Sequence, residues 1–184
     1  PITTIGADTF KSCSSLGAVA IPSKVISIGA NAFDACTSST FAITFAAGSA
    51  LVTIGAQAFR SSNLGAMVIP STDTNLGTGS FEGTSLEEIA FPNSIVFIDA
   101  DAFKDCLSLH SVNFDCRSVV RITASAFSGT NKIISIFLPS TVAYTGTRSL
   151  MTCCLVGSYS ATGGSSAGCV PCQAGKFNPA TGAQ

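Results

Sequence analysis

Apolar residues recur along the chain in a fixed pattern, L-x-x-h-x-h, in which h is an aliphatic or aromatic residue. The pattern occurs at Leu16–Val19–Ile21, Leu64–Met67–Ile69, Leu86–Ile89–Phe91, Leu109–Val112–Phe114 and Ile133–Ile136–Leu138. Its last three positions alternate, which predicts a short strand with one face buried. Pro22, Pro70, Pro92 and Pro139 follow directly and end the strand, because proline lacks a backbone donor. The second copy is irregular, with Ile43 and Phe45 at the strand positions and the extra residues AAGSA at 46–50.

A second motif lies between these strands and is built around phenylalanine. Phe recurs about every two dozen residues, and five positions before it stands an aliphatic residue that Gly follows in four copies. The Phe residues are Phe10, Phe33, Phe59, Phe81, Phe103 and Phe127, and the aliphatic residues are Ile5, Ile28, Ile54, Leu76, Ile98 and Ile122. Six aligned copies are strong evidence of an internal repeat.

One repeat of this length cannot bury its own apolar side, so we expect the copies to stack into a solenoid. Stacking places equivalent strands in a parallel ladder at roughly 4.8 Å, and each Phe ring then packs against the rings above and below it as the core of the repeat. We assign residues 1–150 to this domain, as about six full copies and a degenerate seventh that ends at Leu150. Residues 151–184, in which aliphatic residues nearly vanish, form a second segment.

The low charge content narrows the classes of partner. Charged residues make up 10% of the chain and the formal net charge is −1. Lys and Arg are scattered singly, which argues against nucleic acid and against anionic membrane surfaces. The uncharged stretch 36–59 is long enough to cross a bilayer. It contains a complete copy of the Phe motif among Ser, Thr and Gly, so we interpret it as a repeat and expect no membrane insertion.

The third position after each Phe holds a small residue. These residues are Cys13, Cys36, Ser62, Thr84, Cys106 and Thr130. A catalytic nucleophile would occur once beside a base, whereas interchangeable residues in six copies indicate packing. Cys13 and Cys36 lie in adjacent coils, so a disulfide between them is geometrically possible. Buried free thiols are the favoured interpretation, because Cys106 has no cysteine in its neighbouring coils and Cys116 lies beyond an extended strand.

The recurring string L-x-x-V-x-I-P-x-x-V-x-x-I-G-x-x-A-F-x-x-C resembles the BspA-type leucine-rich repeat over residues 1 to about 150. The resemblance implies an α/β-type repeat solenoid, a right-handed leucine-rich-repeat coil with short parallel strands on one face that is mostly β and loop. It also implies a place on the surface of a bacterium or microbial eukaryote, a role in adhesion and protein binding, and no catalytic residues. We expect no cofactor.

The last segment resembles the ephrin-receptor-like, growth-factor-receptor-type cysteine-rich repeat. Two copies of C-x-x-G-x-(Tyr/Phe) begin at Cys154 and Cys172. The resemblance implies a disulfide between Cys154 and Cys169, a partner for Cys172 beyond Gln184, and an irregular, disulfide-stapled structure. A zinc site formed by Cys153, Cys154, Cys169 and Cys172 is the competing interpretation, although zinc ribbons use two separated C-x-x-C pairs. Disulfides would indicate an oxidising compartment.

The outward positions of the strands are the candidate binding surface. Solenoids use such a face for partners, and an apolar patch on it would mark an interaction site. The candidate binding residues are Phe41, Thr44, Val68, Glu87, Glu88, His110, Asn113, Ile134 and Phe137. Exposed Phe41 and Phe137 would be unusual on a solvated sheet. An equally weighted interpretation is that small residues let the coils curve and that the aromatic residues cover neighbouring loops.

Two other groups have candidate chemistry. His110 is the only histidine, and we do not expect a catalytic base there because no nucleophile is placed beside it. Asp99, Asp101 and Asp105 crowd one turn and could hold Ca²⁺ loosely, but solvation of an outer turn explains them equally and is preferred. No metal site is expected.

Three hypotheses for function follow. The first is a non-enzymatic, extracellular or cell-surface recognition module that binds a protein or surface glycan. The second is a structural stalk or coat segment, and the third and weakest is a polysaccharide-active enzyme on a parallel β-helix. The chain opens with Pro1 partway through a repeat, so we expect it to be a fragment that lacks signal and anchor.

Overall fold

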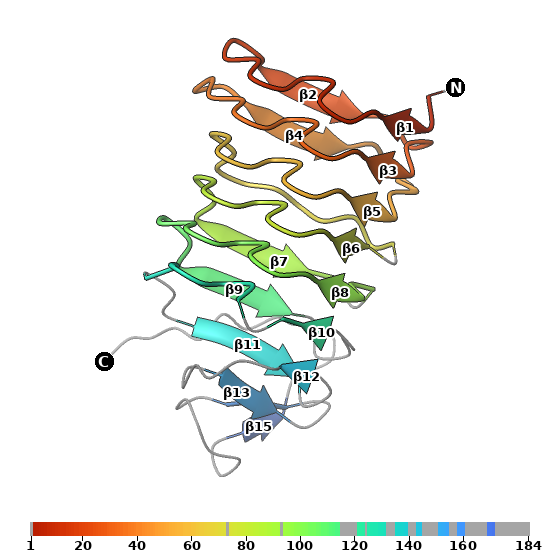
Figure 1. The fold of residues 1–184 in the computed structure, drawn as a ribbon. Helices are drawn as coiled ribbons and strands as arrows, with labels where there is room; N and C mark the ends of the chain where they lie inside the picture. Colours follow the sequence, from red (N-terminus) through yellow and green to blue (C-terminus); the bar gives the residue numbers. More distant parts are fainter. Residues whose placement is uncertain are drawn as a thin grey trace.

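The structure is a computed structural model of the chain. It describes residues 2–72, 74–92, 94–114, 121–123 and 125–131, together with the backbone of five later strands, β11 Ser135–Pro139, β12 Ala143–Tyr144, β13 Met151–Cys154, β14 Ser158–Ser160 and β15 Cys169–Pro171. The described part is a stack of coils, and a typical coil passes through a longer strand, a short strand and a turn, although none of the longer strands forms between residues 54 and 75 (Figure 1).

The L-x-x-h-x-h segments form longer strands that pair in parallel, as the sequence predicts, except for residues 64–69, which form only an isolated bridge, and one further longer strand follows the last copy of the pattern. The strands are β2 Ala18–Ile21, β4 Ala42–Phe45, β7 Glu88–Phe91, β9 Ser111–Phe114, β11 and β13. β2 pairs with β4, and β7, β9, β11 and β13 pair in succession. The coil between these two groups makes a single parallel bridge, from Val68 to Ala90. The ladder continues past residue 150, because Met151 lies in register with Ile136.

A second ladder, which the sequence pattern does not predict, runs beside the first. Its strands are β1 Thr4–Ile5, β3 Ser27–Ile28, β5 Thr53–Ile54, β6 Asn75–Leu76, β8 Phe97–Ile98, β10 Arg121–Ile122 and β12. They form one parallel sheet in that order. In this second ladder, every strand except β12 ends on the aliphatic residue of the Phe motif. That residue is buried in each copy from Ile28 onwards.

The third side of each coil is a turn centred on Phe, and its backbone is also bonded from coil to coil. Asp8, Phe10 and Ser12 donate their N–H groups to the carbonyls of Ala30, Ala32 and Asp34, and later coils repeat the arrangement. The residues two before and two after Phe adopt positive φ, about 52° to 58° at the non-glycine positions. This alternation directs every second N–H along the stack.

The α/β label of the predicted fold is therefore wrong for the part of the chain that the structure describes, which contains no helix. Most of the turn residues have small or polar side chains. The residues two positions before and two positions after Phe adopt left-handed φ, as Asp8 and Ser12 do in the first turn. A helix would need each N–H to bond four residues back within its own coil. These N–H groups instead bond to the next coil.

The Phe rings form one continuous column. Successive centroids from Phe10 to Phe127 are 5.1–5.2 Å apart and the ring planes lie within 13° of parallel. Phe33, Phe59, Phe81 and Phe103 are fully buried, whereas Phe10 in the first coil is only partly buried. The ring spacing is close to the roughly 4.8 Å that is typical between paired strands, so stacking of the coils allows both ring packing and backbone hydrogen bonding.

The glycine that begins the Phe motif permits this close stacking. A Cβ on Gly29 would lie 2.6 Å from the backbone nitrogen of Ala7 and 2.7 Å from the carbonyl carbon of Gly6. Gly55 meets the coil before it in the same way, with 2.8 Å to the nitrogen of Ala30. Gly is thus required at these contacts between backbones, whereas Asp99 and Thr123 hold the equivalent position in the last two copies.

Truncation of a central ring should cost far more than truncation of the first. We expect Phe103→Ala to lower the free energy of unfolding by about 3–5 kcal/mol, because a ring between two stacked neighbours leaves a cavity. Phe10→Ala, the matched control, should cost clearly less because only one ring covers it. Urea unfolding followed by circular dichroism measures both. Equal losses, or no loss for Phe103→Ala, would contradict a stacked column.

A methyl group on Gly29 should destabilise the protein through overpacking. We expect Gly29→Ala to cost about 1–3 kcal/mol, since a backbone and not a flexible side chain must yield. Gly65→Ala is the control, because nothing lies within 4 Å of its Cβ position, and we expect a change within about 0.5 kcal/mol. The same unfolding measurement tests the pair, and the close contact would be disproved by equal stability.

Candidate recognition surface

The strand face is the set of described outward residues of the longer strands, of the residues directly before them, and of the bridge segment 65–68. They are Gly17, Ala18, Ala20, Ala42, Thr44, Gly65, Ala66, Val68, Glu87, Glu88, Ala90, His110, Ser111 and Asn113. The parallel register aligns them in columns. One column runs from Ala20 to Thr44, and another joins Val68, Ala90 and Asn113.

Most of the predicted binding residues that the structure describes do lie on this face. Thr44, Glu87, Glu88 and His110 are exposed, and Val68 is 81% exposed, the most of any large apolar side chain described. Asn113 is half-buried, and its Nδ2 donates to Ser111 Oγ at 3.1 Å. Their use by a partner remains a prediction.

The prediction that Phe41 is exposed is wrong. Phe41 is only 4% exposed, and its ring centroid lies 5.9 Å from that of Phe33. The second copy has no leucine at the start of its pattern, and Phe41 takes the buried place that Leu64 and Leu86 hold elsewhere. A turn that bonds the N–H of Phe41 to the carbonyl of Ser38 directs the side chain inward.

Two further candidates are not tested. Ile134 lies outside the described residues. Phe137 belongs to β11, where its backbone pairs with Asn113 and Thr152, but its side chain lies outside the described part.

The only histidine has no arrangement typical of a catalytic base. The backbone N–H of His110 donates to the carbonyl of Glu87, and its Nδ1 lies 3.2 Å from the carbonyl of Ser108. These contacts are with the backbone and hold the residue at the edge of its strand. No nucleophilic side chain is bonded to the ring in these contacts.

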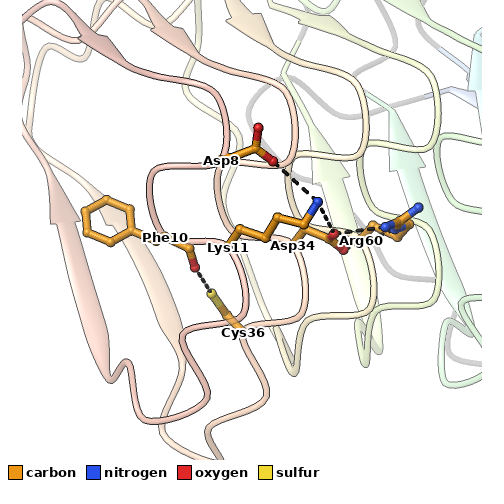
Figure 2. Close-up of polar contacts among 6 residues, drawn as sticks. All are labelled: Asp8, Phe10, Lys11, Asp34, Cys36 and Arg60. Atoms are coloured by element: carbon orange, nitrogen blue, oxygen red, sulfur yellow. Dashed lines mark hydrogen bonds and ion pairs between the residues drawn. The ribbon is translucent and has the colours of Figure 1, made fainter.

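The charges on the turn side are paired, a feature that the sequence analysis missed. The residue directly after each of the first five Phe residues of the motif alternates in sign: Lys11, Asp34, Arg60, Glu82 and Lys104. Arg60 donates two hydrogen bonds to the buried Asp34 carboxylate, at 3.1 and 2.9 Å, and Lys11 lies 3.6 Å from the same group (Figure 2). Lys104 lies 3.7 Å from Glu82.

We call these five residues the charge ladder. Asp34 pairs with Lys11 and Arg60 of the two neighbouring coils, and Glu82 pairs with Lys104 of the next coil, so these charges favour the observed order of coils. The hydrogen bonds to Asp34 raise the pKa of the Arg60 guanidinium, so it stays charged. The signal was visible in the sequence as the alternation of sign immediately after Phe.

The three described thiols of the packing column are free, and two of them are bonded to backbone carbonyls. Cys13, Cys36 and Cys106 form no disulfide, so the possible Cys13–Cys36 bridge is absent. Cys36 Sγ donates to the carbonyl of Phe10 at 3.2 Å (Figure 2), and Cys106 Sγ donates to that of Phe81 at 2.9 Å. Burial raises the pKa of both Cys36 and Cys106, which keeps them protonated. Thr84 donates to the carbonyl of Phe81 in its own turn at 3.0 Å, so this position bonds to a Phe carbonyl whether it holds Thr or Cys, although Cys36 and Cys106 use the carbonyl of the preceding coil.

The C-terminal cysteines lie outside what the structure describes at side-chain level. Cys153 and Cys154 belong to β13, and Cys169 belongs to β15, which pairs antiparallel with β14. Cys116 and Cys172 lie outside the described residues. The Cys154–Cys169 disulfide and the zinc alternative therefore stay predictions.

In the acidic turn of the fifth coil, the carboxylates of Asp99 and Asp101 accept hydrogen bonds from neighbouring coils. Asp99 accepts hydrogen bonds from Thr78 Oγ1 at 2.8 Å and from the backbone N–H of Ala100 at 2.7 Å. Asp101 accepts from Ser128 Oγ at 3.5 Å. Within the described residues, no group of three or more His, Cys, Asp or Glu side chains is placed to hold a metal ion. No helix of this part is long and apolar enough to span a membrane.

Comparison with known proteins agrees with this repeat geometry. Residues 1–47 and 52–160 match the family described as BspA type Leucine rich repeat region, in six copies. The gap falls in the irregular second copy. Among curated proteins, none matches the chain.

Solved structures with the same fold include several bacterial proteins. A leucine rich cell surface protein from Faecalibacterium prausnitzii A2-165 is 30% identical, with a TM-score of 0.62 over 80% of this chain and 39% of that one. A leucine-rich repeat protein from Bacteroides ovatus ATCC 8483 is 24% identical, with a TM-score of 0.63 over 84% and 43%. The pneumococcal vaccine antigen PcpA is 23% identical, with a TM-score of 0.50 over 84% and 35%. The last two show the fold alone, and the chain spans less than half of each of these proteins.

Native-state alkylation should distinguish packing thiols from a reactive one. We expect iodoacetamide to label the half-buried Cys13 before Cys36 and Cys106, because burial limits access and the raised pKa limits thiolate. Peptide mass spectrometry at a pH of about 7.5, with and without urea, resolves the sites. Urea should make all three react. Preferential labelling of Cys106 without urea would contradict a packing role.

Proposed function

Because this chain belongs to the BspA-type leucine-rich repeat family, we propose that it is a non-enzymatic recognition module that binds protein or glycan partners through its strand face. We place it at a cell surface or outside the cell. The relative from Faecalibacterium prausnitzii is described as a cell surface protein, which supports this location.

The observation that carries the proposal is the difference between the sides of the coil. On the turn side, the charge ladder joins its members by ion pairs, and the small polar residues of the packing column are buried. On the strand face, Val68 is 81% exposed, and Glu87 and Glu88 form no ion pair with the described residues. The strand face thus holds side chains that stacking does not use, as binding faces of solenoids do.

A structural stalk or coat role is the second candidate. Continuous stacking of the Phe rings favours it, since a rigid column can serve as a spacer without binding anything. The proposed extracellular location is also compatible with the predicted Cys154–Cys169 disulfide, because conditions outside the cell are oxidising. That bridge rests on the resemblance of the last segment alone.

A panel of purified extracellular glycoproteins and immobilised glycans tests recognition. We expect Val68→Arg and Thr44→Arg to weaken binding of a panel ligand about tenfold or more, because a long charged side chain on a flat interface prevents close contact. Leu107→Arg is the matched control, since Leu107 is 60% exposed but lies off the strand face, and it should bind as the unmodified chain does. Surface plasmon resonance measures affinity, and thermal melts confirm that each variant folds.

Two outcomes would contradict the proposal. One is that no ligand of the panel binds, which would favour the stalk. The other is that the strand-face variants and Leu107→Arg bind equally well.

A further inference from the structure

The strand face carries charge of one sign only. Glu87 and Glu88 are exposed, and the described residues of the face include no Lys or Arg. Neither carboxylate takes part in an ion pair within the described part of the chain, whereas Glu82 on the turn side of the same coil pairs with Lys104. Glu82 on the turn side is thus paired with a cation, whereas Glu87 and Glu88 on the strand face are not paired with one in the described part of the chain.

The residues around these two are small or polar, and none of them is Lys or Arg. Glu88 pairs in register with Ser111, and two residues along the strand Ala90 pairs with Asn113 and bridges to Val68. The Glu87 carbonyl accepts the N–H of His110, which brings these residues of adjacent coils together. A patch formed by one exposed valine, alanines and two carboxylates combines an apolar contact with a negative potential.

We propose that the strand face binds an extended, cationic protein segment, with Lys or Arg side chains at Glu87 and Glu88 and an apolar side chain against Val68. This inference rests on the proposed function and names the chemistry of its partner. Charge complementarity steers such a segment to the face and sets its register, and like charges exclude acidic partners. Anionic glycans are disfavoured for the same reason, and a neutral glycan would leave both carboxylates without a counter-charge.

The probe is a pair of synthetic octapeptides, one alternating lysine with valine and the other alternating glutamate with valine. They are titrated into the isotopically labelled chain and followed by heteronuclear NMR. We expect the lysine peptide to shift the amide signals of Val68, of residues 87–90 and of residues 110–113, and to bind more weakly as salt is raised. The glutamate peptide should leave these signals in place.

Variants assign the effect to the two carboxylates. Glu87→Gln combined with Glu88→Gln should weaken binding of the lysine peptide about tenfold, since two exposed charge pairs are lost. Glu82→Gln removes one negative charge from the turn side of the same coil and should leave binding unchanged. Equal binding of both peptides, equal binding by the double variant, or shifts confined to residues 8–12 and 31–36 would each overturn the inference.

Failure of this inference can be told apart from failure of the proposed function. If Val68→Arg abolishes binding of a panel ligand while the lysine peptide does not bind, the recognition face stands and the cationic partner is wrong. If strand-face variants affect neither the panel ligands nor the peptide, both are wrong.

Discussion

The distance between successive coils is the constraint on which the rest of the structure depends. Phe rings stack at 5.1–5.2 Å, two strand ladders pair in parallel, and the turns bond backbone to backbone. The two ladders and the turn must all repeat at the same distance from coil to coil. Each side therefore needs particular residues that fit this distance. The Phe column needs an aromatic ring, the start of the motif needs Gly where a Cβ would meet the backbone, and the turn needs residues that tolerate positive φ. The recurrence of these residues in the sequence follows from that single spacing.

Much of the fold could be predicted because its residues repeat. The longer strands show period-two alternation, and Phe recurs at an almost constant interval. The short strands could not be predicted in this way, since two residues are too few to show a period. The helix implied by the α/β label did not occur in the described coils because left-handed φ beside Phe sends N–H groups to the next coil. Phe41 was misplaced because an irregular copy shifted which residue fills the leucine position, and only the local turn decides that.

The division of labour between sides links the fold to the proposed function. The turn side uses its charges within the stack, where Asp34 is buried between Lys11 and Arg60. The sequence carries the signal for this pairing, the alternation of sign directly after Phe, and the stacking of consecutive copies brings opposite charges together. The strand face keeps exposed residues that have no part in stacking. The match covers 39% of the Faecalibacterium prausnitzii protein and 43% of the Bacteroides ovatus protein.

Native-state hydrogen exchange resolved by residue tests the stacking on all three sides most directly. If each turn is bonded to the next coil, the amides of Phe33, Phe59 and Phe81 should be as strongly protected as those of the inner longer strands. They should also open in the same cooperative unfolding step. Fast exchange of these turn amides beside protected strands would contradict this, because it would mean that the turns are ordinary loops and that the Phe column does not hold the coils together.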